Sequence, residues 1–225
     1  MNIGKSIWIT GNISAGKSTL LCCLEESMVR KNLIFIKEPL CSFQRYETIS
    51  GQILNPLELY YVDIEHEALG FQLHVLDCYE KLLRQIKSKV SQFKSGEVVD
   101  LIWDRTLYDC TIFTQMLHKQ GHIGTFSMQY WCDIYDKVLT EYKAILPTEV
   151  FHLNPPIDFC LSNCQKRLRK DEIKFNNMKE YMKSLQTKYN EYLNKHEDSY
   201  LQLVHAECTE KCDRVKLFKQ TMISF

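Results

Sequence analysis

The residues best suited to chemistry stand near the start of the chain, in the stretch GNISAGKST at residues 11–19. Gly11 is followed after four residues by Gly16, Lys17 and Ser18, which is the spacing of a phosphate-binding loop. In such a loop the backbone wraps around a phosphate, and amide N–H groups point inward at a helix N-terminus. We predict that Lys17 neutralises a transferred phosphoryl group and that Ser18 is a ligand of Mg²⁺. The residues expected to hold the nucleotide are Gly11, Asn12, Ile13, Ser14, Ala15, Gly16, Lys17, Ser18 and Thr19.

The flanks of this loop have the character that the motif requires. A short apolar run ends at Thr10, and the helical-looking segment TLLCCLEESM follows Ser18. The pattern therefore indicates nucleotide binding, but it does not by itself fix the reaction. A GTPase is disfavoured, because NKHED at 194–198 has its Asp one residue too late for a guanine-reading motif and lies in a helical pattern.

Two carboxylates stand where the chain leaves expected strands. Glu38, in IKEPL, ends the second strand, and Asp104, followed by Arg105, ends the third. The carboxyl ends of strands in a parallel sheet face the ligand crevice. There, Glu38 could accept a proton from an attacking hydroxyl, Asp104 could hold Mg²⁺ through water, and Arg105 could stabilise charge on the phosphoryl group. On these residues alone, a solvated glutamate and a structural ion pair remain the alternatives.

The elements that must position these groups are short apolar runs separated by helical patterns, at 6–10, 33–37, 98–103, 149–153 and 200–204. Strands that alternate with helices predict an α/β fold of the P-loop NTPase type, with a five-stranded parallel sheet and helices on both faces. Helices are expected at 67–93, 126–146 and 176–196, the first because apolar residues recur every three or four positions. We expect one domain, 1–225, in which residues 166–172 form a charge-dense joint between two helical patterns.

The composition restricts the partners and the compartment. Lys plus Arg equals Asp plus Glu, 28 each, which argues against nucleic acid or an anionic membrane bound through bulk electrostatics. No apolar run approaches the roughly 20 residues of a membrane span, and the strand-like start leaves no room for a targeting segment. The ten cysteines are expected to be reduced, buried or idle thiols rather than metal ligands. We therefore expect a cytoplasmic protein.

Taken in order, the motifs resemble those of the deoxynucleoside kinases. GNISAGKST, KEPL, FQ, DRTLYDCTIF and RLRKDE follow one another as in the deoxycytidine, deoxyguanosine, mitochondrial thymidine, insect multisubstrate and bacterial deoxyadenosine kinases. The resemblance implies transfer of the γ-phosphoryl group of ATP to the 5′-hydroxyl of a deoxynucleoside, as in nucleotide salvage. It also implies Mg²⁺ as the cofactor, small-molecule substrates and a homodimer.

The resemblance also implies roles for the acceptor residues. Glu38 matches the general base for the 5′-hydroxyl, and Arg105 matches the arginine that holds this hydroxyl and the phosphoryl group. Asp104 stands where many members have Glu and bacterial members have Asp. Gln72 matches the residue that hydrogen-bonds the base edge.

The resemblance also implies the residues that contact the sugar and a short lid at about 164–176. Tyr61 and Glu172 match the pair that grips the sugar 3′-hydroxyl. Arg167 and Arg169 match lid arginines that close on the phosphates, although as a charge run they could also be simply solvated. Asn163 departs from the pattern, because it stands where the family has another lid arginine.

The base pocket is less constrained by the resemblance. Val75 and Tyr79 follow the base-reading glutamine on the same helix face, and Phe113 is expected to stack on the base. DRTLYDCTIF is one residue shorter than the usual segment, so either Asp109 or Cys110 could face the base. Apolar groups at these positions are found in thymidine-accepting members, so we expect pyrimidines, thymidine included, to be preferred over purines.

Two other functions remain possible at this point. A thymidylate-type nucleoside monophosphate kinase shares the loop and the Asp-Arg strand end, but Glu-Pro is then usually followed by Gly-Gly-Thr, whereas Leu40-Cys41-Ser42 follow here. A non-catalytic nucleotide-binding regulator is disfavoured, because it would have no use for a base at Glu38.

We predict that Lys17→Ala abolishes phosphoryl transfer and leaves the fold intact. The loop lysine acts on charge that grows in the transition state, so its loss should raise the barrier strongly. The measurement is turnover of the purified variant with ATP and a deoxynucleoside, beside its circular dichroism spectrum. Near-normal turnover would remove the loop from the mechanism.

Overall fold

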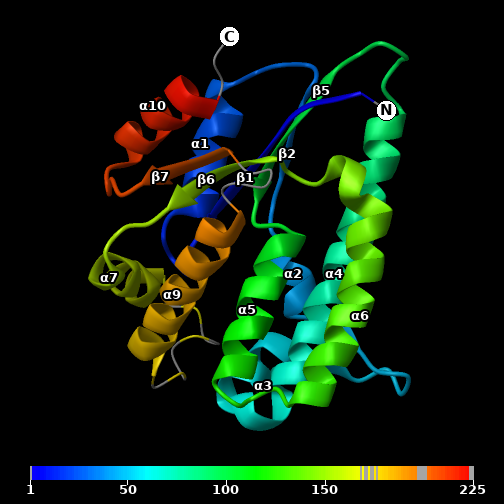
Figure 1. Cartoon of the computed structure of the whole chain (residues 1–225), viewed down its shortest axis with the longest axis vertical. Coiled ribbons are helices and arrows are strands. Elements are labelled where there is room, and N and C mark those ends of the chain that lie inside the picture. Colours follow the sequence, from blue (N-terminus) through cyan, green and yellow to red (C-terminus); the bar gives the residue numbers. More distant parts are fainter. Residues whose placement is uncertain are drawn as a thin grey trace.

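A parallel sheet forms the centre of the computed structural model, which describes residues 2–167, 169, 172, 175, 177–196 and 202–222. Its strand order is β2-β5-β1-β6-β7, and every neighbouring pair is parallel. The strands are β1 (Ile3–Gly11), β2 (Leu33–Ile36), β5 (Val99–Asp104), β6 (Glu149–Leu153) and β7 (Gln202–Ala206). The α/β class with a parallel sheet between helices is thus confirmed (Figure 1).

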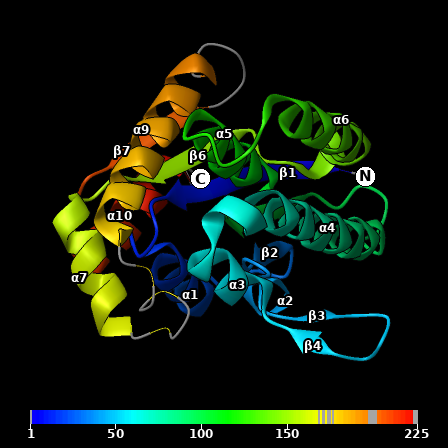
Figure 2. The same ribbon diagram turned by 90° about the horizontal axis from the view of Figure 1, so that it is seen from below.

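Helices cover both faces of the sheet. Seen from below in Figure 2, α9 (Met178–His196), α5 (Leu107–Lys119) and α6 (Thr125–Tyr142) lie on one side of β1 and β6, and α1 (Lys17–Ser27) lies on the other. The helix α10 (Lys211–Met222) packs against α1. The remaining elements are α2 (Leu40–Phe43), the hairpin β3 (Tyr46–Glu47) and β4 (Ile53–Leu54), α3 (Pro56–Val62), α4 (Ile64–Ser91), η1 (Lys143–Ile145) and α7 (Ile157–Arg167).

Two tryptophans on neighbouring strands show how tightly the sheet is enclosed. Trp8 of β1 and Trp103 of β5 are register partners, and both are fully buried. A buried indole N–H needs a partner. Trp103 donates to the Ser6 hydroxyl at 3.0 Å, and Trp8 donates to the Asp109 carboxylate on α5 at 2.8 Å. The central strands are therefore held by polar contacts as well as by apolar packing, and one of these contacts reaches the edge where the site lies.

Caps explain where several helices begin. The helix expected at 67–93 starts earlier, because the Asp63 side chain accepts a hydrogen bond from the His66 amide. The helix α5, which the apolar pattern did not predict, starts from a capping box in which Thr106 and Asp109 exchange hydrogen bonds. The helix expected at 126–146 ends at Tyr142 and continues as the short η1 turn.

Parts of the sequence-based predictions fall outside the described residues. In the expected lid, 168, 170, 171, 173, 174 and 176 are not described, and neither are 200 and 201 of the last expected strand. The single-domain organisation stays a prediction. Among the helices that the structure describes, none combines the length and the apolar character needed to span a membrane.

The junction between β1 and the phosphate loop requires glycine. Gly11 has φ 139°, in a region that favours glycine. A Cβ at this position would lie 2.2 Å from the Leu153 carbonyl oxygen, a backbone atom of the adjacent strand β6. The start of the loop is thus pressed directly against the sheet.

We predict that Gly11→Ala lowers the free energy of unfolding by at least about 3 kcal/mol, because strain at φ and a backbone clash act together. The matched control is Gly96→Ala, where φ is 94° but a Cβ would meet nothing within 4 Å. That variant should lose only the strain, about 1–2 kcal/mol. Urea unfolding of both variants measures the difference, and equal losses would contradict the clash.

Candidate active site

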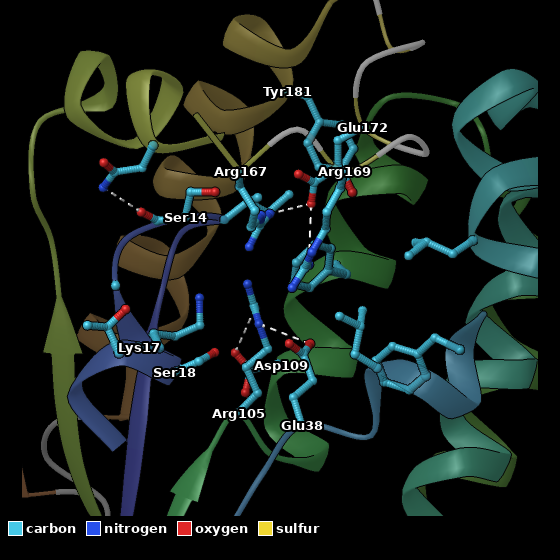
Figure 3. Close-up of a pocket in the computed structure, with 18 of the residues that line it drawn as sticks. Ser14, Lys17, Ser18, Glu38, Arg105, Asp109, Arg167, Arg169, Glu172 and Tyr181 are labelled. Atoms are coloured by element: carbon cyan, nitrogen blue, oxygen red, sulfur yellow. Dashed lines mark hydrogen bonds and ion pairs between the residues drawn. The ribbon is translucent and has the colours of Figure 1, made fainter. Parts of the chain in front are cut away.

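One pocket of about 640 Å³ opens at the carboxyl edge of the sheet and receives residues from nearly every predicted motif. The ends of β1, β2 and β5 meet there, which places the phosphate loop, Glu38 and Arg105 around one space. In Figure 3, the lid residues Arg167, Arg169 and Glu172 lie across the cavity from Arg105 and Glu38. The predicted site residues that line the pocket are Ile13, Ser14, Gly16, Lys17, Ser18, Thr19, Glu38, Tyr61, Gln72, Val75, Tyr79, Arg105, Cys110, Phe113, Arg167, Arg169 and Glu172.

The phosphate loop holds a buried ammonium group against its own backbone. Lys17 is only 6% exposed, and its Nζ donates to the carbonyl oxygens of Gly11 at 3.0 Å and of Asn12 at 2.7 Å. Burial and, to a smaller extent, the nearby Arg105 cation lower the pKa of Lys17 to about 8. A bound anion would offset both effects, so the loop is electrostatically suited to a phosphate.

Ser18 and Asp104 offer oxygen atoms beside this loop. The Ser18 hydroxyl donates to Asp104 Oδ2 at 2.5 Å. Asp104 is 2% exposed, and its Oδ1 has no hydrogen-bond partner among the described residues. A buried carboxylate oxygen without a donor is costly. Hydroxyl and carboxylate oxygens are ligands that Mg²⁺ prefers, so the two residues fit a magnesium ion held together with phosphate.

Glu38 and Arg105 face each other on the acceptor side of the loop. Glu38 Oε1 lies 3.2 Å from Arg105 Nε, and the Glu38 side chain is 24% exposed while that of Arg105 is 6% exposed. Burial raises the pKa of Glu38, and the Arg105 guanidinium opposes this rise. Arg105 itself has a left-handed backbone, with φ 61° at the end of β5. Such a conformation at a non-glycine residue is uncommon and is found most often at functional sites.

A network that the sequence analysis did not identify fixes the far side of Arg105. Arg105 Nη1 donates to the Tyr189 hydroxyl at 2.5 Å and lies 3.3 Å from Asp109 Oδ1. Asp109 also accepts hydrogen bonds from Trp8 and Thr10 on β1 and from Tyr189 at 2.6 Å. Both carboxylate oxygens of Asp109 are therefore engaged inside the protein, which bears on the open choice between Asp109 and Cys110. The spacing of Thr106 and Asp109 as a capping box was the available signal.

Aromatic side chains form the wall of the opposite end of the pocket. Tyr60 stacks on Phe71 with ring centroids 4.6 Å apart, and its hydroxyl lies 2.8 Å from that of Tyr181. Phe113, expected to stack on a base, is half-buried, with the Arg105 guanidinium carbon 5.0 Å from its ring centroid. This end of the pocket is flat-walled and largely apolar, as suits a ring system.

Few polar groups interrupt these aromatic and apolar walls. The Tyr79 hydroxyl is buried and has no hydrogen-bond partner among the described residues. Gln72 is 2% exposed, and its Oε1 lies 3.4 Å from a Thr114 hydroxyl that donates at 2.7 Å to the Cys110 carbonyl oxygen. A hydroxyl has one proton to donate, so the contact with Gln72 is the weaker one. The Tyr79 hydroxyl and the Gln72 amide are thus available to a ligand.

The lid residues are gathered around one buried carboxylate. Glu172 forms an ion pair with Arg167, lies 3.5 Å from Arg169, and accepts a hydrogen bond from the Cys164 thiol at 3.2 Å. Tyr61, the expected partner of Glu172 at the sugar, lines the same pocket and packs against Phe175. In this arrangement the Glu172 carboxylate is held by the lid arginines, and its predicted role at the sugar stays a prediction.

Three further pocket residues had no signal in the sequence. Tyr181 and Tyr60 contribute the hydroxyl pair described above, and Arg214 comes from α10 near the end of the chain. Their positions depend on how distant helices pack, which a linear pattern does not record. Asn163, the departure from the lid pattern, donates a hydrogen bond to the Ser14 carbonyl oxygen at 3.2 Å and so supports the phosphate loop.

Comparison with known proteins places the chain in a family. The family model described as deoxynucleoside kinase matches residues 7–223. A probable deoxycytidine kinase of fowlpox virus is 30% identical over 198 residues, covering 86% of this chain and 74% of the relative. Deoxycytidine kinase 2 of Gallus gallus is 25% identical over 201 residues, covering 84% and 74%.

Solved structures show the same fold at lower identity. A deoxyadenosine kinase from M. mycoides, with the products dCMP and dCDP bound, superimposes with a TM-score of 0.76 and 22% identity over 98% of this chain and all of that one. The same enzyme with dATP bound gives a TM-score of 0.73. The P-loop fold and the kinase activity expected from the motifs are therefore confirmed: the chain belongs to the deoxynucleoside kinase family.

Proposed function

We propose that this kinase transfers the γ-phosphoryl group of ATP to the 5′-hydroxyl of a deoxynucleoside, as a nucleotide-salvage enzyme that prefers pyrimidines. The observation that carries the proposal is the Glu38–Arg105 pair, 3.2 Å apart, in the same pocket as the Lys17 loop. A proton acceptor (Glu38), a cation (Arg105) and a phosphate-binding loop then surround one space. The homodimer implied by the family resemblance and the cytoplasmic location expected from the sequence remain predictions.

Each group has a defined part in the transfer. The nucleoside 5′-oxygen forms a bond to the γ-phosphorus, the bond from that phosphorus to the β–γ bridging oxygen breaks, and the hydroxyl proton passes to Glu38. Arg105 stabilises the charge that spreads over the transferring group, and the Lys17 ammonium neutralises the phosphates from the loop side. The raised pKa of Glu38 makes it a better proton acceptor than an ordinary solvated glutamate.

Magnesium would be held by Ser18 directly and by Asp104 through water. When bound, Mg²⁺ neutralises charge on the phosphates and orients them. The unpartnered Oδ1 of Asp104 supports this assignment, because a metal-bound water would supply the missing donor. The Ser18 hydroxyl donates to the other oxygen of the same carboxylate, so the two residues lie side by side.

The base preference is argued from the far end of the pocket. Val75, Tyr79 and Cys110 provide no charged group to read a base edge, and the carboxylate of Asp109 is occupied by internal donors. That leaves neutral hydrogen-bonding groups, such as the Gln72 amide and the Tyr79 hydroxyl, to contact the base. Apolar walls discriminate weakly, so several pyrimidines should be accepted.

We predict that Glu38→Gln keeps nucleoside binding but lowers kcat by about 10²–10⁴-fold, the usual share of a positioned base. In the unmodified enzyme, kcat should fall as the pH drops through the raised pKa of Glu38, because the proton acceptor is then protonated. This acid limb should lie above the ordinary glutamate range and should vanish in the variant. Glu25→Gln, at an exposed carboxylate of α1, is the matched control. A large rise in KM with little change in kcat would make Glu38 a binding residue instead.

For the base, we predict that kcat/KM is higher for thymidine and deoxycytidine than for deoxyadenosine and deoxyguanosine. Val75→Ala removes methyl groups from the pocket wall and should move the ratio toward purines by up to about tenfold. The measurement is kcat/KM for the four deoxynucleosides and their monophosphates side by side. A strong purine preference or no thymidine turnover would contradict the pocket assignment, and turnover of monophosphates alone would point to a thymidylate-type kinase.

A further inference from the structure

Arg214, on the last helix, reaches back to the phosphate loop at the other end of the chain. It stands in the first turns of α10 and is 4% exposed. Its Nη1 donates to the carbonyl oxygen of Ala15, 199 positions earlier, at 2.6 Å. Its Nε donates to the Cys208 carbonyl oxygen at 2.7 Å, and the guanidinium carbon lies 5.3 Å from the Phe159 ring centroid. The guanidinium is thus clamped from three sides, with one edge against the loop.

The contact with Ala15 fixes the orientation of a peptide unit of the cradle. In a trans peptide the C=O and the following N–H point in opposite directions, and the described chain contains no cis peptide bond. When Arg214 holds the Ala15 oxygen outward, the Gly16 N–H points to the opposite side. Amide groups directed into the loop are what bind a phosphate at a helix N-terminus.

The glycine at position 16 fits this contact. A Cβ there would lie 2.1 Å from Arg214 Nη1, so only a residue without a side chain lets the guanidinium lie against the loop backbone. Gly16 also has φ 96°, which favours glycine independently. The shape of the loop backbone at Gly16 is therefore complementary to the Arg214 guanidinium.

Arg214 has no ion-pair partner within the part of the chain that the structure describes, and the Glu210 carboxylate acts on it only from a greater distance. Its two hydrogen-bond acceptors are neutral carbonyl oxygens, and no ion pair with a described carboxylate accompanies them. Its Nη2 is buried and has no hydrogen-bond partner there. Buried cations are normally paired. Because Arg214 lines the same pocket as the loop, an anion bound in the cradle would be the nearest source of compensating charge.

We propose that Arg214 is a positioning residue for the donor phosphates: it holds the Ala15–Gly16 peptide in its phosphate-binding orientation and contributes a positive charge without an ion-pair partner beside the cradle. The proposal rests on the proposed function, because it takes ATP as the anion in the loop. It predicts an effect on the donor that is separate from any effect on the nucleoside. Among the described residues, no hydrogen bond or ion pair joins Arg214 to Glu38 or Arg105.

The test uses Arg214→Met, which keeps the length of the side chain but removes its donors, and Arg214→Lys, which keeps the charge but cannot span two carbonyl oxygens. The matched control is Lys216→Met, at an exposed position of the same helix. We measure KM for ATP, KM for thymidine at saturating ATP, and the rise in Tm caused by ATP. Loss of a charge-assisted hydrogen bond should raise KM for ATP by about 10–100-fold in the Met variant and by less in the Lys variant.

In the Met and Lys variants, KM for thymidine should stay within about twofold of the unmodified value, and the rise in Tm caused by ATP should become smaller. Arg214→Gly should recover part of its ATP affinity when methylguanidine is added, because the free guanidinium can replace the missing donors. A folded Arg214→Met or Arg214→Lys variant with unchanged KM for ATP would overturn the proposal. Equal losses for both substrates with a lowered basal Tm and no methylguanidine rescue would also overturn it, because Arg214 would then only hold the fold. An unmodified protein that neither binds nor uses ATP would instead overturn the proposed function.

Discussion

The buried guanidinium of Arg105 is the group on which the acceptor side of the pocket depends. It lies 3.2 Å from Glu38 on one side and is tied to Asp109 and Tyr189 on the other. A buried cation of this kind is tolerable only when its partners are fixed. Asp109 meets that condition, since it also accepts hydrogen bonds from Trp8 and Thr10 on β1. The central strand, α5 and α9 are therefore joined beside Glu38 and the phosphate loop.

Around this fixed centre, the pocket contains buried groups whose charge or hydrogen-bonding capacity is not fully satisfied within the described chain. Lys17 is buried with a lowered pKa, Asp104 Oδ1 lacks a donor, and the Tyr79 hydroxyl lacks a partner. Under the proposed function, a phosphate, a hydrated magnesium ion and a nucleobase edge would satisfy Lys17, Asp104 and Tyr79, respectively. Because unpaired buried polar groups cost free energy, ligands that satisfy several of them together should bind cooperatively.

The two ends of the chain converge on the donor side of the pocket. The loop after β1 meets α7 through Asn163 and α10 through Arg214. The acceptor side is instead built by α4 and α5, whose residues Gln72 and Cys110 line the far end. Under the proposed function, the donor and acceptor sites therefore rest on different parts of the fold, and Arg105 stands between them at the end of β5.

The sequence by itself determined the elements whose causes are local. The loop at 11–19, the apolar strand runs and the polar residues at strand ends follow from spacing and periodicity, so Lys17, Glu38 and Arg105 could be placed at one sheet edge before any coordinates. The family resemblance added Gln72 and Tyr61 and the lid residues Arg167, Arg169 and Glu172, all of which line the pocket. The helix α5 was missed because its start is set by the Thr106 cap more than by an apolar pattern.

Only the tertiary structure decided which side chains complete these groups. Asp109 could not be assigned from the sequence, because its role depends on donors from β1 and α9 that are up to 101 positions away. Arg214 carries no motif, and its contact with Ala15 exists only because α10 packs against α1. The physical reason is general: a backbone motif is encoded by neighbours in the chain, whereas the partners of a buried charge are chosen by packing between distant elements.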